Sequence, residues 1–345
     1  MPNELNPRLR QRLRRRPLPS REALVRGILQ GDRVVLGQAI TLVESSRPDH
    51  QQLALEVVEA CLPHAGKARR LGITGVPGVG KSTFIEALGQ HVIGRGHRVA
   101  VLAIDPTSKV SGGSILGDKT RMEQLAARPE AFIRPSPAGD QLGGVAARTR
   151  EAIVLCEAAG YDLVLVETVG VGQSETAVHS MVDCFLLLLL PGGGDELQGI
   201  KRGIVEMADL IAVNKADGER LPLAREAQRA YRNALRLMPP HPAGWQPRVL
   251  LCSALTGEGI AEVWEAVEAF FAQAQASGYL QENRARQARF WLHESIDQQL
   301  RRLFMDHPQV RTLLPRYERE VAAGRMSALR AATLLMEAFV GEGDG

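Results

Sequence analysis

With 345 residues, of which 45% are hydrophobic and 23% charged, the chain has the composition of a globular protein with a large core. The net charge of +3 is uneven: residues 1–30 carry eight Arg against two Glu, so residues 31–345 carry −3. This mildly acidic body excludes a broad basic face for nucleic acid. No apolar run approaches the ~18 residues that a membrane span needs.

The four cysteines and eight histidines are scattered along the chain. No C-x-x-C pair occurs and no histidines stand at metal-ligand spacing, so we expect reduced cysteines buried in a core. There is also no apolar segment typical of a secretory signal. These features together predict a cytoplasmic protein.

The first 66 residues divide into a tail and a helical segment. Residues 1–19 are Arg-rich and are expected to be a disordered tail; a transit peptide is the alternative, which the low Ser content disfavours. Residues 20–66 show helical periodicity, which predicts three helices. They are expected over Ser20–Gln30, after a cap at Asp32, and over Gln51–Leu62, with Pro48 breaking the second helix.

Residues 67–277 alternate between short apolar runs and helical stretches, which is typical of a mostly parallel sheet covered on both faces. The sequence therefore predicts an α/β fold. The expected strands are Leu71–Thr74, Arg98–Ile104, Ala131–Arg134, Asp162–Val166, Cys184–Leu190, Leu210–Val213 and Val249–Leu251. Helices between them include Thr83–Gly94, Ala146–Ala159 and Ile260–Ala274.

In residues 278–345 the strands stop and two amphipathic helices are expected. One carries an apolar stripe from Leu292 to Leu303, and the other follows a cap at Ser327. These helices could pack on the core or pair with a second copy of the chain. We slightly favour pairing, and so a homodimer.

The most specific motif begins at the end of the first strand and matches G-x-x-x-x-G-K-[ST]. Its glycines let backbone N–H groups surround a phosphate, and the following helix adds its positive end. Lys81 is expected to bridge the β- and γ-phosphates, and Ser82 to supply an oxygen to Mg²⁺. The predicted phosphate-binding residues are Gly75, Val76, Pro77, Gly78, Val79, Gly80, Lys81, Ser82 and Thr83.

A second motif, N-K-x-D, identifies the expected nucleotide as GTP. Asp217 would accept hydrogen bonds from guanine N1–H and the 2-amino group, which adenine lacks. Lys215 would lie over the base, and Asn214 would tie this loop to the phosphate loop. After the next strand, a backbone N–H in the loop formed by Ser253, Ala254 and Leu255 can reach guanine O6.

Three carboxylates are expected near the metal and the γ-phosphate. Asp105 and Glu167 end apolar strands, and Asp118 lies in a glycine-rich loop, where a loop cap is the alternative. With Ser82 these are the predicted Mg²⁺ ligands. Gly170 would sense the γ-phosphate, so Lys81, Glu167 and Gly170 are the predicted catalytic residues. Because no activating group can be assigned, we expect slow hydrolysis that a partner or a dimer accelerates.

The sequence resembles the MeaB/ArgK family of GTPases. The resemblance rests on these two motifs and on three further segments: Asp105-Pro-Thr-Ser, residues 111–122 and Val166–Glu175. The resemblance implies a SIMIBI-class P-loop fold with a C-terminal helical arm that forms a homodimer. It also implies that GTP gates adenosylcobalamin loading of methylmalonyl-CoA mutase and protects that enzyme. Asp195, Gln198 and Lys201 match the family's partner-sensing switch; from the sequence alone this stretch is a glycine-rich turn.

Two other functions stay open on the sequence. The older family label implies a P-loop kinase or ATPase that phosphorylates a lysine/arginine/ornithine transport binding protein. A nickel-insertion GTPase has a similar architecture, but that role normally needs clustered Cys and His ligands, and the sequence shows none.

Overall fold

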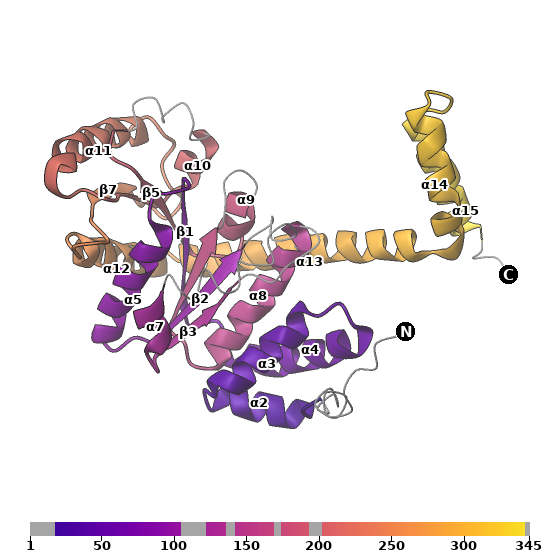
Figure 1. Ribbon diagram of the computed structural model, residues 1–345, viewed down its shortest axis with the longest axis horizontal. Coiled ribbons are helices and arrows are strands. Elements are labelled where there is room, and N and C mark those ends of the chain that lie inside the picture. The colour runs from indigo at the N-terminus through magenta and orange to yellow at the C-terminus, as the bar shows by residue number, and fades with distance from the viewer. Residues whose placement is uncertain (1–17, 105–121, 136–141, 169–173, 193–201, 342–345) are drawn as a thin grey trace, which may run out of the picture. The chain divides into compact units, whose positions relative to one another are not determined.

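The computed structural model describes residues 18–104, 122–135, 142–168, 174–192 and 202–341 (Figure 1). The chain divides into two compact units, Met1–Arg284 and Ala285–Gly345. The domain boundaries predicted after residues 19, 66 and 277 stay predictions. Among the described residues, no helix is both long enough and apolar enough to cross a membrane.

The first unit is built on a seven-stranded sheet with the order β3-β2-β4-β1-β5-β6-β7. Every recorded strand pair is parallel, which confirms the predicted α/β fold. The carboxyl end of β1 lies where the chain changes direction along the sheet, because β2–β4 and β5–β7 lie on opposite sides of β1. The strands are β1 Arg69–Gly75, β2 Val99–Ile104, β3 Ala131–Arg134, β4 Leu163–Thr168, β5 Cys184–Leu189, β6 Leu210–Val213 and β7 Arg248–Leu251.

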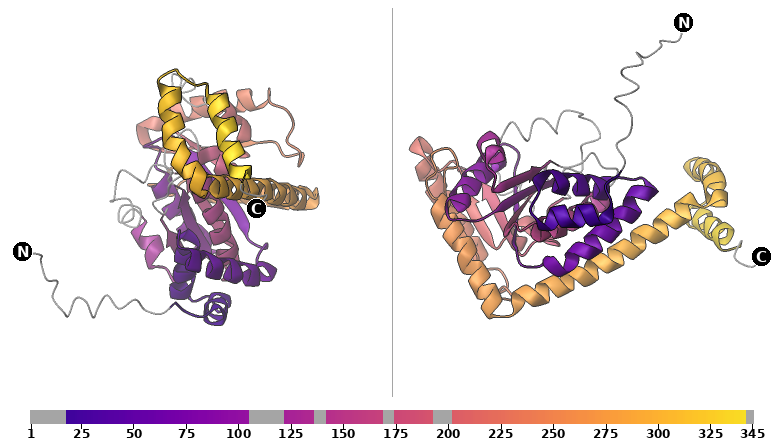
Figure 2. Two further views of the ribbon diagram at one scale, coloured as in Figure 1. Left: turned by 90° about the vertical axis from the view of Figure 1, so that its right-hand side faces the viewer. Right: turned by 90° about the horizontal axis from the view of Figure 1, so that it is seen from below.

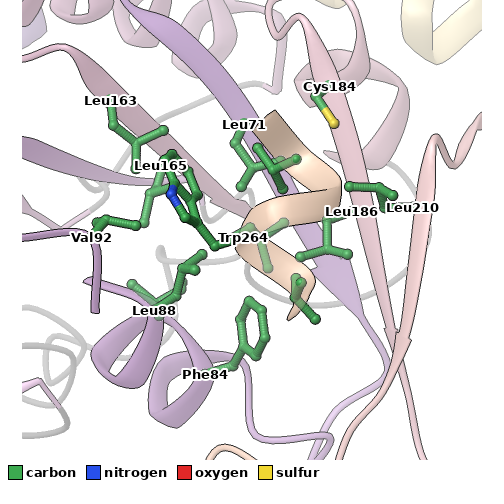
Figure 3. Close-up of a cluster of buried hydrophobic side chains, with 14 of the residues drawn as sticks. Leu71, Phe84, Leu88, Val92, Leu163, Leu165, Cys184, Leu186, Leu210 and Trp264 are labelled. Carbon is green, nitrogen blue, oxygen red and sulfur yellow. The ribbon is translucent and has the colours of Figure 1, made fainter. Parts of the chain in front are cut away.

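Helices cover both faces of this sheet, so nearly all strand side chains are buried (Figures 1 and 2). Trp264 of α12 is fully buried among side chains of α5 and the strands, including Leu71 and Leu165 (Figure 3). The helices of one face are α5 Lys81–Gly94, α7 Glu123–Ala127 and α12 Ile260–Ala276. Those of the other face are α8 Leu142–Ala158, α9 Ser174–His179, α10 Arg202–Met207 and α11 Leu221–Leu235.

The three predicted N-terminal helices are present and pack on one another and on α8, as the indigo helices of Figure 2 show. Asp32 caps the second helix by accepting hydrogen bonds from the N–H groups of Val34 and Val35. The predicted break between the second and third helices is present, since α3 ends at Glu44, but the third helix begins at Pro48 and not at Gln51, because proline is tolerated in the first turn. The helices are α2 Arg21–Leu29, α3 Arg33–Glu44 and α4 Pro48–Cys61, followed by the 3₁₀ turn η1 Leu62–His64.

The start of α13 (Tyr279–Asp306) is anchored to the first unit by Arg284. Its guanidinium donates to both carboxylate oxygens of Asp183, at 2.8 and 2.5 Å, and to the carbonyls of Gly66 and Ala68. The Asp183 side chain is fully buried, so Arg284 supplies the positive charge that its carboxylate needs.

The described part of the chain after residue 278 contains three helices and not the two predicted. The missed helix is α14, Pro308–Ala322, which begins at one proline and contains another, Pro315. It packs on α15, Ala328–Val340, whose Ser327 cap was predicted. On α13, the predicted stripe is exposed in the single chain; its members are Leu292, Ile296, Leu300 and Leu303.

Candidate functional site

The phosphate loop runs from Gly75, the last residue of β1, to Gly80, directly before α5. A side chain at Gly75 would lie 2.5 Å from the carbonyl oxygen of Leu188, so only glycine lets β1 end this close to β5. Gly80 has a φ of +91°, which favours glycine, and it turns the chain into the helix. The loop therefore places the N-terminus of a 14-residue helix at the carboxyl edge of the sheet, which suits an anion.

Lys81 is the first residue of α5, and its ammonium group folds back over the loop. Its Nζ donates a hydrogen bond to the carbonyl oxygen of Gly75 at 2.7 Å. Burial lowers the pKa of Lys81, while the charges of Glu167 and Glu175 act in the opposite direction and favour the cation. The loop thus carries one positive charge in a partly desolvated place, where it interacts strongly with phosphate.

Asn214 joins three loops that are far apart in the sequence. It follows β6, and its side chain is 1% exposed. Its Nδ2 donates to the carbonyl oxygen of Val79 at 2.8 Å, and its Oδ1 accepts from the N–H of Ala254 at 3.0 Å. The predicted guanine loops are therefore fastened to the phosphate loop through one amide group.

Lys215 and Asp217 extend this connection. Lys215 has a φ of +58°, which is unusual for a residue other than glycine, and its Nζ donates to the carbonyl oxygen of Gly78 at 2.7 Å. Asp217 accepts a hydrogen bond from the hydroxyl of Ser253, which is fully buried. Leu255 is 85% exposed. The second motif thus lies beside the first, as expected for one nucleotide that contacts both.

Residues 36–309 match the family described as "Methylmalonyl Co-A mutase-associated GTPase MeaB". The chain belongs to this family. It therefore binds and hydrolyses GTP, as the resemblance implied.

Relatives of this MeaB-family GTPase cover most of its length. "GTPase ArgK" of Escherichia coli (strain K12) is 52% identical, over 80% of this chain and 83% of the relative. "Methylmalonic aciduria type A homolog, mitochondrial" of Mus musculus is 48% identical, over 92% of this chain and 79% of the relative. A solved structure titled "Crystal structure of LAO/AO transport system kinase" is 40% identical with a TM-score of 0.73, and covers 92% of this chain and 97% of that chain.

The predicted metal ligands of the MeaB-family chain are only partly described. Ser82 lies in the first turn of α5. Glu167 was predicted to end its strand; it is the last residue but one of β4, paired with Ile73 of β1 and Ala103 of β2. The other predicted residues of this region and of the partner switch lie outside the described residues: Asp105, Asp118, Gly170, Asp195, Gln198 and Lys201.

Two polar groups near the phosphate loop were not among the predicted site residues. Glu175, the second residue of α9, is 3% exposed, and its charge acts on Lys81. The Thr168 hydroxyl donates to that of Thr74 at 2.9 Å, which joins the ends of β4 and β1. Nothing in the sequence indicated that Glu175 is buried. Helix α9 has only six residues, which is too short for a periodic apolar pattern to show which of its faces lies inside.

Proposed function

We propose that this GTPase gates the loading of adenosylcobalamin into methylmalonyl-CoA mutase, or a related cobalamin-dependent mutase, and protects that enzyme. The observation that carries the proposal is the match of residues 36–309 to a family described as mutase-associated. The Asn214 bonds between the nucleotide loops support a timing role, because base and phosphate contacts are then linked through one amide.

In this proposal the two motifs divide the recognition of GTP. Gly75–Thr83 bind the phosphates, and Lys81 stabilises charge that develops on the γ-phosphate during hydrolysis. Asp217 reads the guanine edge, Lys215 covers the base, and the loop Ser253–Leu255 reads guanine O6. The exposure of Leu255 and the Asp217–Ser253 hydrogen bond support a base site open to solvent at this edge.

Mg²⁺ is part of the proposal, and the described donors fit it. The hydroxyl of Ser82 and the carboxylate of Glu167 are oxygen donors, which Mg²⁺ prefers, and Glu167 is buried close enough to act on Lys81. We propose Asp105 and Asp118 as further ligands. The bound ion would neutralise charge on the β- and γ-phosphates, and Gly170 would respond to the γ-phosphate.

We also propose a cytoplasmic homodimer whose Asp195, Gln198 and Lys201 sense the mutase. The exposed apolar stripe of α13 supports pairing through the second unit, because four large apolar side chains at helical spacing stand in solvent in the single chain. The four cysteines, all free and buried, support a reducing compartment.

The proposal is tested by loading apo-mutase with adenosylcobalamin in the presence of this chain and GTP, GDP or a non-hydrolysable GTP analogue. We expect the amount of holo-mutase formed to depend on the nucleotide. Lys81→Ala should remove the difference between GTP and its analogue. Loading that is the same with every nucleotide and without this chain would refute the proposal.

The solved relative titled as a LAO/AO transport system kinase favours a second candidate, phosphorylation of a transport binding protein. Labelled GTP separates the two functions, because a kinase transfers the γ-phosphate to a protein hydroxyl or carboxylate. Our proposal predicts that all label is released as inorganic phosphate. Label that stays on a lysine/arginine/ornithine binding protein would support the kinase.

A further inference from the structure

Helix α11 and the residue that caps its C-terminus carry four arginines on one face, here called the basic stripe. It consists of Arg225, Arg229, Arg232 and Arg236, all exposed. At 100° per residue, the spacings of four, three and four residues place them within about 60° of arc and along roughly 16 Å of the helix. No acidic residue of α11 falls within this arc; the nearest, Glu226, lies about 60° outside it.

The helix that presents the stripe is firmly held. Ala224, Tyr231 and Leu235 are buried in a cluster with side chains of β6 and β7 (α11 and β7 are labelled in Figure 1). Gln228 and Arg232 both donate to the carbonyl oxygen of Val249, at 2.9 and 3.1 Å, and so cover a backbone acceptor of the edge strand β7. The stripe therefore projects from a rigid element.

The arginines of the stripe differ from several other arginines of the first unit. Arg70, Arg134 and Arg284 each pair with a carboxylate. Within the described residues, no ion pair is recorded for Arg225, Arg229 or Arg236. Like charges at i,i+4 repel and destabilise a helix, a cost that the isolated chain offsets at Arg232 and Arg236 through the Val249 hydrogen bond and the negative end of the helix.

One neighbour extends the surface. Leu237, directly after Arg236, is 88% exposed, which is high for a large apolar side chain. Arginines around an exposed apolar side chain are a composition typical of protein interfaces, where a few such residues supply most of the affinity.

We propose that the basic stripe with Leu237 is a docking surface for an acidic face of the mutase, an inference that rests on the proposed function. Guanidinium groups bind carboxylates in a bidentate way, and a row of four fits a row of carboxylates on a partner helix or strand. A long polyanion fits less well, because residues 31–345 carry a net charge of −3 and repel it. The stripe begins eight residues after Asp217 and runs away from the guanine loop, because Arg232 bonds Val249 near the start of β7.

The test is a triple variant, Arg225→Ser, Arg229→Ser and Arg236→Ser, which keeps Arg232 because it bonds Val249. The control removes three exposed charges elsewhere in the first unit: Arg21→Ser, Arg26→Ser and Lys67→Ser. Binding to purified methylmalonyl-CoA mutase is measured at 50 and 200 mM salt, with GTP turnover of each variant alone. We expect the stripe variant to raise Kd about 10-fold at low salt and to weaken the salt dependence, with turnover unchanged.

The outcomes distinguish a failure of the docking inference from a failure of the proposed function. If the wild-type chain does not bind the mutase at all, the proposed function fails. If it binds and the stripe variant binds equally well, or no more weakly than the control, the inference is overturned. Stripe-dependent binding to a DNA duplex tighter than to the mutase, or loss of self-association in the variant, would also overturn it. Should the Ser variant fail to fold, the Lys variant at the same positions should still raise Kd about threefold, because it loses bidentate pairing.

Discussion

The amide of Asn214 offers the sharpest test of how the nucleotide loops are held together. Asn214→Ala removes the donor to the carbonyl of Val79 and the acceptor from the N–H of Ala254, both inside the fold. A buried polar group that loses its partner costs about 1–3 kcal/mol. With two such groups and some relaxation of the loops, we expect the free energy of unfolding to fall by about 2–4 kcal/mol.

The assay is urea unfolding followed by tryptophan fluorescence, since Trp245 and Trp264 are buried in the first unit. GDP affinity is measured in parallel and should fall at least about 10-fold, because the phosphate loop loses its attachment to the guanine loops. Asn233→Ala, at an exposed position of α11, is the control and should change the unfolding free energy by less than about 0.5 kcal/mol. A change of that small size in Asn214→Ala would refute the reasoning.

Three further predictions concern single charges. Lys81→Ala should abolish GTP hydrolysis, measured as phosphate release, because the charge that stabilises the γ-phosphate is lost; unchanged turnover would exclude this role. Asp217→Asn should shift the ratio of GTP to XTP turnover towards XTP, and an unaltered ratio would show that the base is read elsewhere. Arg284→Met should lower the free energy of unfolding by about 3–5 kcal/mol, since the buried Asp183 carboxylate loses its cationic partner; Arg289→Met, an exposed residue of the same helix, is the control.

The strands and the phosphate loop could be predicted because local signals agree there. Apolar runs without alternation, such as Cys184–Leu189, have few alternatives to a buried parallel strand. Gly75 and Gly80 each meet a steric or backbone demand that only glycine satisfies easily, so the loop motif reflects its geometry. The place of Asn214 against the phosphate loop followed from the N-K-x-D motif.

The features that were not predicted depend on tertiary packing or on the position of a residue within its helix or strand, and both are encoded weakly in the sequence. Two prolines hid α14, although Pro308 stands at the first turn, where its missing N–H costs nothing. For the same reason α4 begins at Pro48, three residues before the predicted start at Gln51. Glu167 was expected directly after the apolar run that ends at Val166, but β4 continues to Thr168 because β1 and β2 pair with it that far. The order of the strands and the charge of Glu175 beside Lys81 arise only when distant segments meet.

The central claim is that GTP hydrolysis by this chain is a timing step for a mutase. Its most direct test is the rate of GTP turnover by the purified chain, with ATP as the control nucleotide, as methylmalonyl-CoA mutase is titrated in. The claim predicts slow turnover of GTP alone, a rate that rises and saturates with added mutase, and no such response with ATP. A GTP rate that does not change at any mutase concentration would contradict it.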